Sequence, residues 1–132
     1  MEETESFCRK AARDIAARQE FPFLLRLRNG DVLVGAAGLV RGDWSVPKFE
    51  IGYWLRTKFI GHGYATEAAK ALTRFARRHL CVRRLEIRID PRNARSAAVA
   101  RRAGFILEAA LCQDARDNRG RLRDTQVFVK LF

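Results

Sequence analysis

A loop with two closely spaced glycines carries the clearest chemical signal in this sequence. Lys58, Gly61 and Gly63 follow a strand-like segment and directly precede a helical pattern that begins near Tyr64. Glycine adopts backbone angles that a Cβ forbids, so consecutive amides in such a loop can turn toward one centre. The first N–H groups of the following helix have no acceptor within the helix and point the same way. The spacing therefore predicts a cradle of backbone amides that binds an anion.

The elements on both sides of the loop determine where this cradle lies. Segment 49–55 alternates in polarity, which indicates a strand, and apolar residues of 64–80 recur at helical spacing. A strand at 85–89 follows, and Asn93 is a suitable N-cap for a helix that ends at Gly104. The first strand-helix-strand unit should cross over right-handed, which makes its two strands parallel. The side chains expected on the apolar faces are Phe49, Ile51, Tyr53 and Leu55 in the strand, and Ala65, Ala68, Ala69, Leu72, Phe75 and Ala76 in the helix.

The remaining segments complete a single domain over residues 1–132. The further expected elements are a helix at 4–20, a hairpin of strands 23–28 and 32–40 around an Asn-Gly turn, and a final antiparallel pair of strands at 105–112 and 125–132 with a turn at 117–120. This order of helices and strands predicts an α/β fold with a sheet of mixed strand direction.

The composition limits the classes of function. The net charge is +11, which favours an anionic partner. A nucleic-acid partner is not expected, because the arginines spread along the whole chain and many fall on the polar faces of expected helices. No apolar run approaches the roughly 20 residues of a membrane span, and the acidic start of the chain does not resemble a secretory leader. We therefore expect a cytoplasmic protein with no membrane partner.

The cysteines and histidines do not predict a metal site. Cys8, Cys81 and Cys112 are isolated from one another and lack the spacing of zinc ligands, and only His62 and His79 are available beside them. We expect the cysteines to be small buried apolar residues. No metal is implied.

Several motifs together resemble one known family. They are the strand Glu-Ile-Gly-Tyr-Trp-Leu at 50–55, the loop residues Lys58, Gly61 and Gly63, the pair Asn93 and Ser96, and the pair Gly104 and Phe105. In this combination the chain is similar to the GNAT superfamily of N-acetyltransferases, and most closely to the branch that acetylates ribosomal-protein N-termini and other amines. The resemblance covers residues 23–132. Lys58 departs from the glutamine or arginine that is usual at the first position of the family's pyrophosphate motif.

The resemblance implies a fold and a cosubstrate. The fold would be a mixed, mostly antiparallel sheet, flanked by helices, whose central parallel strand pair splays into a V. Acetyl-CoA would lie in this V, where the unpaired amides and carbonyls of two diverging strands can bind its pantetheine arm. Its pyrophosphate would lie on the loop amides, and a backbone N–H near Trp54 or Leu55 would hold the thioester carbonyl. The implied cofactor-binding residues are Trp54, Leu55, Arg56, Lys58, Gly61, His62, Gly63, Tyr64, Ala65, Asn93 and Ser96.

The catalytic roles that the resemblance implies each have a structural alternative. Ser96 would protonate the departing thiolate, or it is only a first-turn helical hydroxyl, and Asn93 would bind the pantetheine arm, cap the helix, or do both. Glu50 is the first candidate for the base that deprotonates the amine, because its apolar neighbours could raise its pKa; the alternative is an ion pair with an arginine. Asp114 is the second candidate, and its alternative is a solvated aspartate in a hairpin. Phe128 stands where many relatives carry a tyrosine that protonates the thiolate.

These residues predict an acetyl-CoA-dependent N-acetyltransferase in which a primary amine attacks the thioester directly. The acceptor would be a protein N-terminus, such as that of a ribosomal protein, or a small amine. A catalytically weak CoA-binding or ribosome-associated domain is the alternative. Family members usually begin with a further strand and helix, so the chain resembles a form shortened at the N-terminus, and an exposed sheet edge would favour a homodimer.

Overall fold

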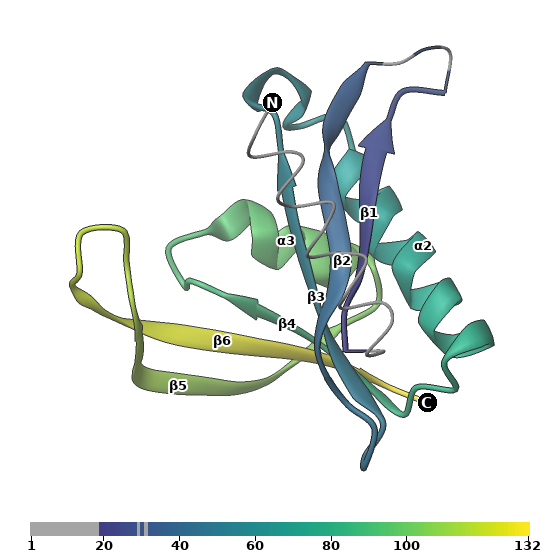
Figure 1. Ribbon diagram of the computed structural model, residues 1–132. Coiled ribbons are helices and arrows are strands. Elements are labelled where there is room, and N and C mark those ends of the chain that lie inside the picture. Colours follow the sequence, from purple (N-terminus) through teal and green to yellow (C-terminus); the bar gives the residue numbers. More distant parts are fainter. Residues whose placement is uncertain (1–18, 29, 31) are drawn as a thin grey trace.

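The computed structural model describes residues 19–28, 30 and 32–132. They form one six-stranded sheet with two α-helices (Figure 1). In chain order the elements are β1 (Phe21–Arg26), β2 (Leu33–Asp43), β3 (Lys48–Leu55), the 3-10 turn η1 (Thr57–Phe59), α2 (Tyr64–His79), β4 (Arg84–Ile89), α3 (Ala94–Arg102), β5 (Ile106–Arg116) and β6 (Leu122–Leu131).

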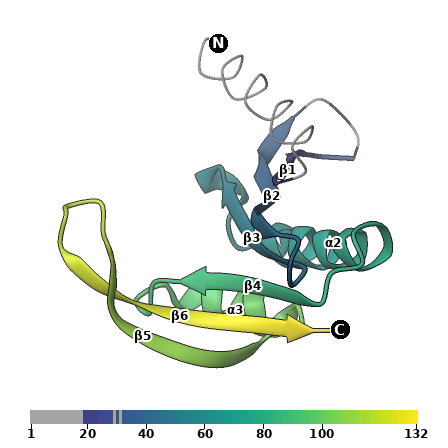
Figure 2. The same ribbon diagram turned by 60° about the horizontal axis from the view of Figure 1, so that its bottom comes forward.

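The order of strands in the sheet is β1-β2-β3-β4-β6-β5. All neighbours are antiparallel except β3 and β4, which run parallel because α2 connects them. The helices α2 and α3 contact each other and lie on one face of the sheet, α2 over β2 and β3 and α3 over β4 (Figure 2). The predicted α/β fold with a mixed sheet is confirmed.

The core lies between the sheet and these two helices. Phe49 and Ile51 of β3, and Leu85 and Ile87 of β4, are buried against them, as the alternation of the sequence predicts. Full burial of such side chains contributes about 1.5–3 kcal/mol each. The helices present mainly alanine to the sheet, and small side chains allow close packing. The buried face of α2 consists of Ala65, Ala68, Ala69, Leu72, Thr73 and Ala76, which differs from the predicted stripe in two ways: Phe75 is only partly buried, and Thr73 is buried although it is not predicted.

The central parallel pair separates after a short contact. β3 and β4 are paired only at Lys48–Arg84, Phe49–Leu85 and Glu50–Glu86. β3 then continues to Leu55, while β4 stays paired with β6 as far as Ile89. Figure 1 shows the two strands diverging beyond this point. The predicted V is therefore present, and it opens at Glu50.

The ends of several strands differ from their predicted positions. β1 begins at Phe21 and includes Pro22, and among the described strands it pairs only with β2. Proline is tolerated at such an edge because its missing N–H leaves no ladder bond unmade. The β5–β6 hairpin is longer than predicted at its tip, although the turn at 117–120 is confirmed. Residues 4–18 of the predicted first helix lie outside the described residues, and residues 19–20 are not helical.

The prediction for the cysteines is wrong where it can be compared. Cys81 and Cys112 are exposed free thiols, and Cys8 lies outside the described residues. Cys81 lies in the connection from α2 to β4, and Cys112 lies on the outermost strand β5, so neither position faces the core. Within 19–28, 30 and 32–132, no cluster of His, Cys, Asp and Glu could hold a metal, and no helix could cross a membrane.

Candidate functional site

The glycine loop presents unpaired amides at the start of α2. Gly61 and Gly63 both have positive φ, +86° and +80°, and Gly63 is the N-cap of α2. No carbonyl of the described residues accepts a hydrogen bond from the N–H groups of residues 61–66, and the first paired amide is that of Glu67, which donates to Gly63 O at 3.0 Å. A Cβ added at either glycine would meet no atom within 4 Å. The amides of this loop thus have no partner in the described protein, and the two glycines leave room beside them, as an anion cradle requires.

This loop forms one wall of a hollow of about 560 Å³. Such a size is within the range of small-molecule sites. The hollow lies between the end of β3, the start of α2 and the first turns of α3, on the helix side of the V. Its lining residues are Tyr53, Leu55, Ile60, Gly61, Gly63, Tyr64, Ala65, Thr66, Asn93, Ala94, Arg95, Ser96, Ala98, Val99 and Arg102.

Most of the predicted cofactor-binding residues meet in this hollow. Those that line it are Leu55, Gly61, Gly63, Tyr64, Ala65, Asn93 and Ser96. They come from three segments that are distant in the sequence, and the β3-α2-β4 crossover followed by α3 brings them together.

Four predicted residues lie beside the hollow without lining it. Arg56 donates to the backbone oxygen of Leu33 at 3.0 Å, and the Nζ of Lys58 lies 5.2 Å from the ring centroid of Phe59. The ring of His62 packs beside Tyr64, and the exposed side chain of Trp54 leaves β3 on the opposite face from Tyr53. The wall of the hollow is therefore made by backbone amides rather than by these side chains.

The backbone of β3 selects Leu55 over Trp54 as the donor toward the gap. The N–H of Arg56 donates to the carbonyl of Val34 in β2 at 2.8 Å. Because successive amides of a strand point to opposite sides, the amide of Leu55 faces away from β2 and into the V, whereas that of Trp54 faces β2.

Asn93 fixes the start of α3. Its Oδ1 accepts a hydrogen bond from the backbone N–H of Ser96 at 3.1 Å, so its predicted capping role is confirmed. This bond also places Ser96 in the first turn, at the edge of the hollow.

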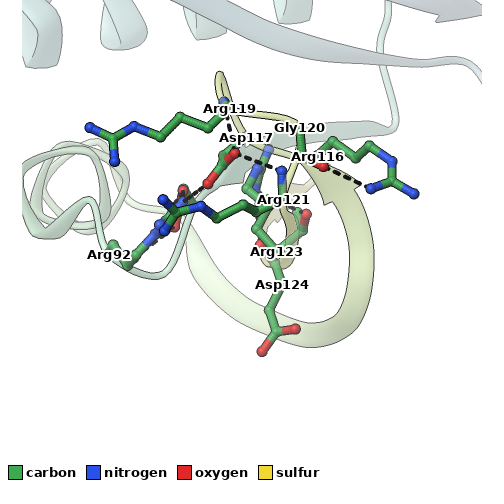
Figure 3. A network of polar contacts seen from close by, with 10 residues as sticks. Arg92, Arg116, Asp117, Arg119, Gly120, Arg121, Arg123 and Asp124 are labelled. Atoms are coloured by element: carbon green, nitrogen blue, oxygen red, sulfur yellow. Dashed lines mark hydrogen bonds and ion pairs between the residues drawn. The ribbon is translucent and has the colours of Figure 1, made fainter.

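The loop before α3 is held by a network of charges (Figure 3). Arg92 donates to Asp90 through its backbone N–H at 2.9 Å and through Nη2 at 2.7 Å. These hydrogen bonds lower the pKa of Asp90 to about 2. Asp117, in the β5–β6 turn, accepts from the backbone N–H groups of Arg119 and Arg121 and lies 3.6 Å from Nη2 of Arg92. The tip of the β5–β6 hairpin is thereby tied to the loop that positions Asn93.

Tyr53 and Ser96 join the two sides of the hollow. The hydroxyl of Tyr53, on β3, donates to Oγ of Ser96, on α3, at 3.0 Å. Both side chains are partly buried, and burial raises the pKa of Tyr53 despite this hydrogen bond. The phenol therefore stays protonated at neutral pH.

A second hollow lies on the opposite face of the sheet, where the V begins. It measures about 200 Å³ and is lined by Arg41, Lys48, Phe49, Glu50, Glu86 and Arg88. Glu50 lies 3.3 Å from Arg41, so the predicted alternative of an arginine ion pair is present. Burial nevertheless raises the pKa of Glu50, against the attraction of Arg41 and Arg88.

Asp114 does not line either hollow but is connected to the second one. Its Oδ2 lies 3.8 Å from Nη1 of Arg88, which also donates to Glu86 at 3.1 Å. Burial opposes ionisation of Glu86, but hydrogen bonds from Arg84 and Arg88 leave its pKa lowered. Asp114 is thus linked through Arg88 to the hollow that Glu50 lines.

The model of the acetyltransferase (GNAT) domain family matches residues 1–106. This chain belongs to the GNAT acetyltransferase family. It is 29% identical over 109 residues to the uncharacterized N-acetyltransferase p20 of Bacillus licheniformis, over 83% of this chain and 61% of that protein. It is 36% identical over 83 residues to the ribosomal-protein-serine acetyltransferase of Escherichia coli (strain K12), over 63% of this chain and 46% of that protein.

The fold is also similar to that of a solved acetyltransferase structure. The Microcin C7 self-immunity acetyltransferase MccE, in complex with acetyl-CoA and AMP, superposes with a TM-score of 0.88 at 24% identity. The match covers 99% of this chain and 71% of that chain. Of the two bacterial relatives, p20 and the ribosomal-protein-serine acetyltransferase, this GNAT chain spans less than two thirds of the length.

The sequence motifs of the GNAT family do not by themselves select Tyr53 as a site residue. Two signals were available: the alternation of β3 places Tyr53 on the helix side, and Asn93 places Ser96 in the first turn of α3. Their contact across the gap depends on the packing of α3 against β4, which no local pattern shows.

Proposed function

We propose that this chain binds acetyl-CoA along the V and transfers its acetyl group to a primary amine. One observation carries the proposal: the unpaired amides of residues 61–66 open onto a hollow that is also lined by α3 and by the part of β3 that has separated from β4. A pyrophosphate fits such amides because they offer several donors at the positive end of a helix. An extended amide chain fits the strand edge, where Leu55 offers an N–H and Asn93 a side-chain amide.

Acetyl-CoA would supply an acetyl group activated as a thioester. Ser96, which lines the hollow, would give a proton to the sulfur as the C–S bond breaks. The electron pair of the amine forms the new C–N bond, and the proton that the amine loses passes to a base. The products are an amide and a free thiol, with no acyl-enzyme, because no cysteine lines either hollow within the described residues.

Glu50 is the proposed base. It stands where β3 and β4 separate, on the face opposite the helices, so an amine could approach the thioester from that side. A carboxylate with a raised pKa holds a proton more readily at neutral pH than an ordinary glutamate does. Asp114 remains the second candidate, since Arg88 links it to the same hollow.

The charges around Glu50 favour an acceptor with a single amine over a polyamine. Glu50 is paired with Arg41, Glu86 with Arg88, and Asp114 also with Arg88. A second ammonium group would therefore find no unpaired carboxylate among these residues. A peptide N-terminus, including that of a ribosomal protein, can present a single amine without a second ammonium group.

A cytoplasmic location and a homodimer through the edge strand β1 stay predictions.

A binding domain without catalysis is the second candidate, and Phe128 favours it. This side chain is fully buried in β6 beneath Arg101 and carries no hydroxyl, so it offers no proton to a thiolate.

Two measurements separate the acetyltransferase from the binding domain. Acetyl-CoA at a hundred times its dissociation constant should stabilise the protein by about 2.7 kcal/mol, seen as a rise in melting temperature. Release of CoA in the presence of an amine, measured by chromatography, then demonstrates transfer. A melting shift without CoA release from a panel of amines would support the binding domain.

A further inference from the structure

The phenol of Tyr53 is hydrogen-bonded to the hydroxyl of Ser96 across the hollow. Tyr53 donates, and Oγ of Ser96 accepts, at 3.0 Å. The backbone N–H of Ser96 is occupied by Asn93, and no acceptor for the Ser96 hydroxyl proton lies within the described part of the chain. That proton is therefore available to a group in the hollow, which Ser96 lines.

We propose that Tyr53 positions the Ser96 hydroxyl and replaces its proton when Ser96 protonates the departing thiolate. This inference rests on the proposed acetyl transfer. As the C–S bond breaks, its electron pair stays on sulfur, which takes the proton of Ser96. Oγ of Ser96 takes the proton of Tyr53, and the resulting phenolate recovers a proton from solvent. The net reaction remains amine plus thioester to amide plus thiol.

The acidities of the three groups support this sequence. A thiol has a pKa of about 8.5 and a phenol of about 10, and burial raises the pKa of Tyr53 further, so this phenol is a weaker acid than the thiol. An aliphatic hydroxyl is much weaker, and a donor behind it strengthens it because consecutive hydrogen bonds polarise one another. Tyr53 thus supplies acidity that Ser96 lacks.

The other groups that face the hollow do not offer an equivalent proton. Arg95 and Arg102 of α3 are guanidinium groups, which stay protonated in proteins. Tyr64 of α2 has its ring against Phe59 and His62, and no hydrogen bond joins its hydroxyl to another described residue. Tyr53 is therefore the group in direct contact with Ser96.

The first test compares Tyr53→Phe with Ser96→Ala, using acetyl-CoA and a peptide that begins with serine. Tyr53→Phe keeps the ring in place, so the KM and the melting shift for acetyl-CoA should be unchanged, while kcat falls by about 10- to 100-fold. Ser96→Ala should reduce kcat at least as much, and the double variant should be no slower than Ser96→Ala. Released CoA should be measured by chromatography, because Cys81 and Cys112 would react with thiol reagents. A wild-type kcat in Tyr53→Phe, or independent additive losses, would overturn the proposal.

A second test requires no acceptor and separates positioning from packing. The thiol of bound CoA is titrated by its ultraviolet thiolate absorbance, with CoA-free protein as the blank. The hydrogen-bond chain stabilises the thiolate, so the pKa of the bound thiol should be higher by about one pH unit in Tyr53→Phe than in the natural protein. Equal values would contradict the chain.

Should Tyr53→Phe fail to fold, 3-fluorotyrosine offers a conservative replacement, since the chain has only two tyrosines. The more acidic phenol should move the alkaline loss of kcat to lower pH, and an unmoved profile would contradict the role of Tyr53. If the natural protein does not bind acetyl-CoA, or does not release CoA in the presence of an amine, the proposed function itself is contradicted.

Discussion

Glu50 and Glu86 are partners at the last paired position of β3 and β4, yet their carboxyl groups are in opposite electrostatic states. Burial raises the pKa of Glu50 above its ordinary value, whereas hydrogen bonds from Arg84 and Arg88 lower that of Glu86. The two side chains line the same hollow, so the difference comes from their hydrogen bonds. Of the two carboxyl groups, Glu50 is therefore the better candidate to accept a proton from an amine.

Glu50→Gln should reduce kcat for acetyl transfer by about 100-fold or more, because a positioned base contributes factors of this size. Acetyl-CoA binding should be retained, since Glu50 lies outside the hollow that holds the loop amides. In the natural protein, kcat/KM should fall in acid with an apparent pKa above the ordinary value of a glutamate. This fall should be absent in the variant. Glu108→Gln, which changes an exposed ion pair with Arg84, serves as the control. Equal activity of both variants would exclude Glu50 as the base and leave Asp114 to be tested.

Local sequence patterns predict those parts of the site that lie within a single strand, helix or loop. The alternation in β3, the small apolar stripe of α2 and the cap formed by Asn93 are each set by spacing within one element. The loop at Gly61 and Gly63 follows for the same reason, because positive φ at these positions is a property of the residue type.

The parts that depend on packing are not predictable in this way. The contact of Tyr53 with Ser96 requires two elements that meet only after the crossover, and the Arg41–Glu50 pair joins β2 to β3 across an irregular register. Cys81 is exposed in the connection after α2, where it has a positive φ of +50°, which no local pattern indicates. Burial and partner choice are properties of the assembled sheet, so a single sequence leaves them open.

Asp90→Asn should destabilise the protein at neutral pH but not in acid. Hydrogen bonds from Arg92 hold the pKa of Asp90 at about 2, below its ordinary value of 3.8. A depressed pKa means that the ionised carboxylate stabilises the fold above pH 4, and that this contribution disappears as the pH falls toward 2. The difference in melting temperature between natural protein and variant should therefore be present at pH 7 and largely lost at pH 2. Arg92→Gln should reproduce this pattern, and the double variant should add nothing; a loss independent of pH would show that the ion pair is not the cause.

The acceptor preference should change when the partner of Glu50 is removed. The natural protein should acetylate a peptide that begins with serine with a kcat/KM roughly tenfold or more above that for spermidine, since a second ammonium would face Arg41 and Arg88 without a free carboxylate. Arg41→Gln leaves the carboxylate of Glu50 without its guanidinium and should narrow this ratio. Spermidine as the better substrate of the natural protein would contradict the reasoning.

The strictest test of the proposed cradle uses two glycines with the same conformation. Gly63 and Gly120 have φ of +80° and +77°, and a Cβ at either would meet no atom within 4 Å. Glutamate at either site should therefore cost a similar amount of stability, about 1–2 kcal/mol for a side chain in the left-handed region, and changes the net charge equally. Only Gly63 faces the hollow, so Gly63→Glu should abolish the melting shift with acetyl-CoA, while Gly120→Glu should keep it. If both variants retained the shift, the pyrophosphate would have to bind away from the start of α2.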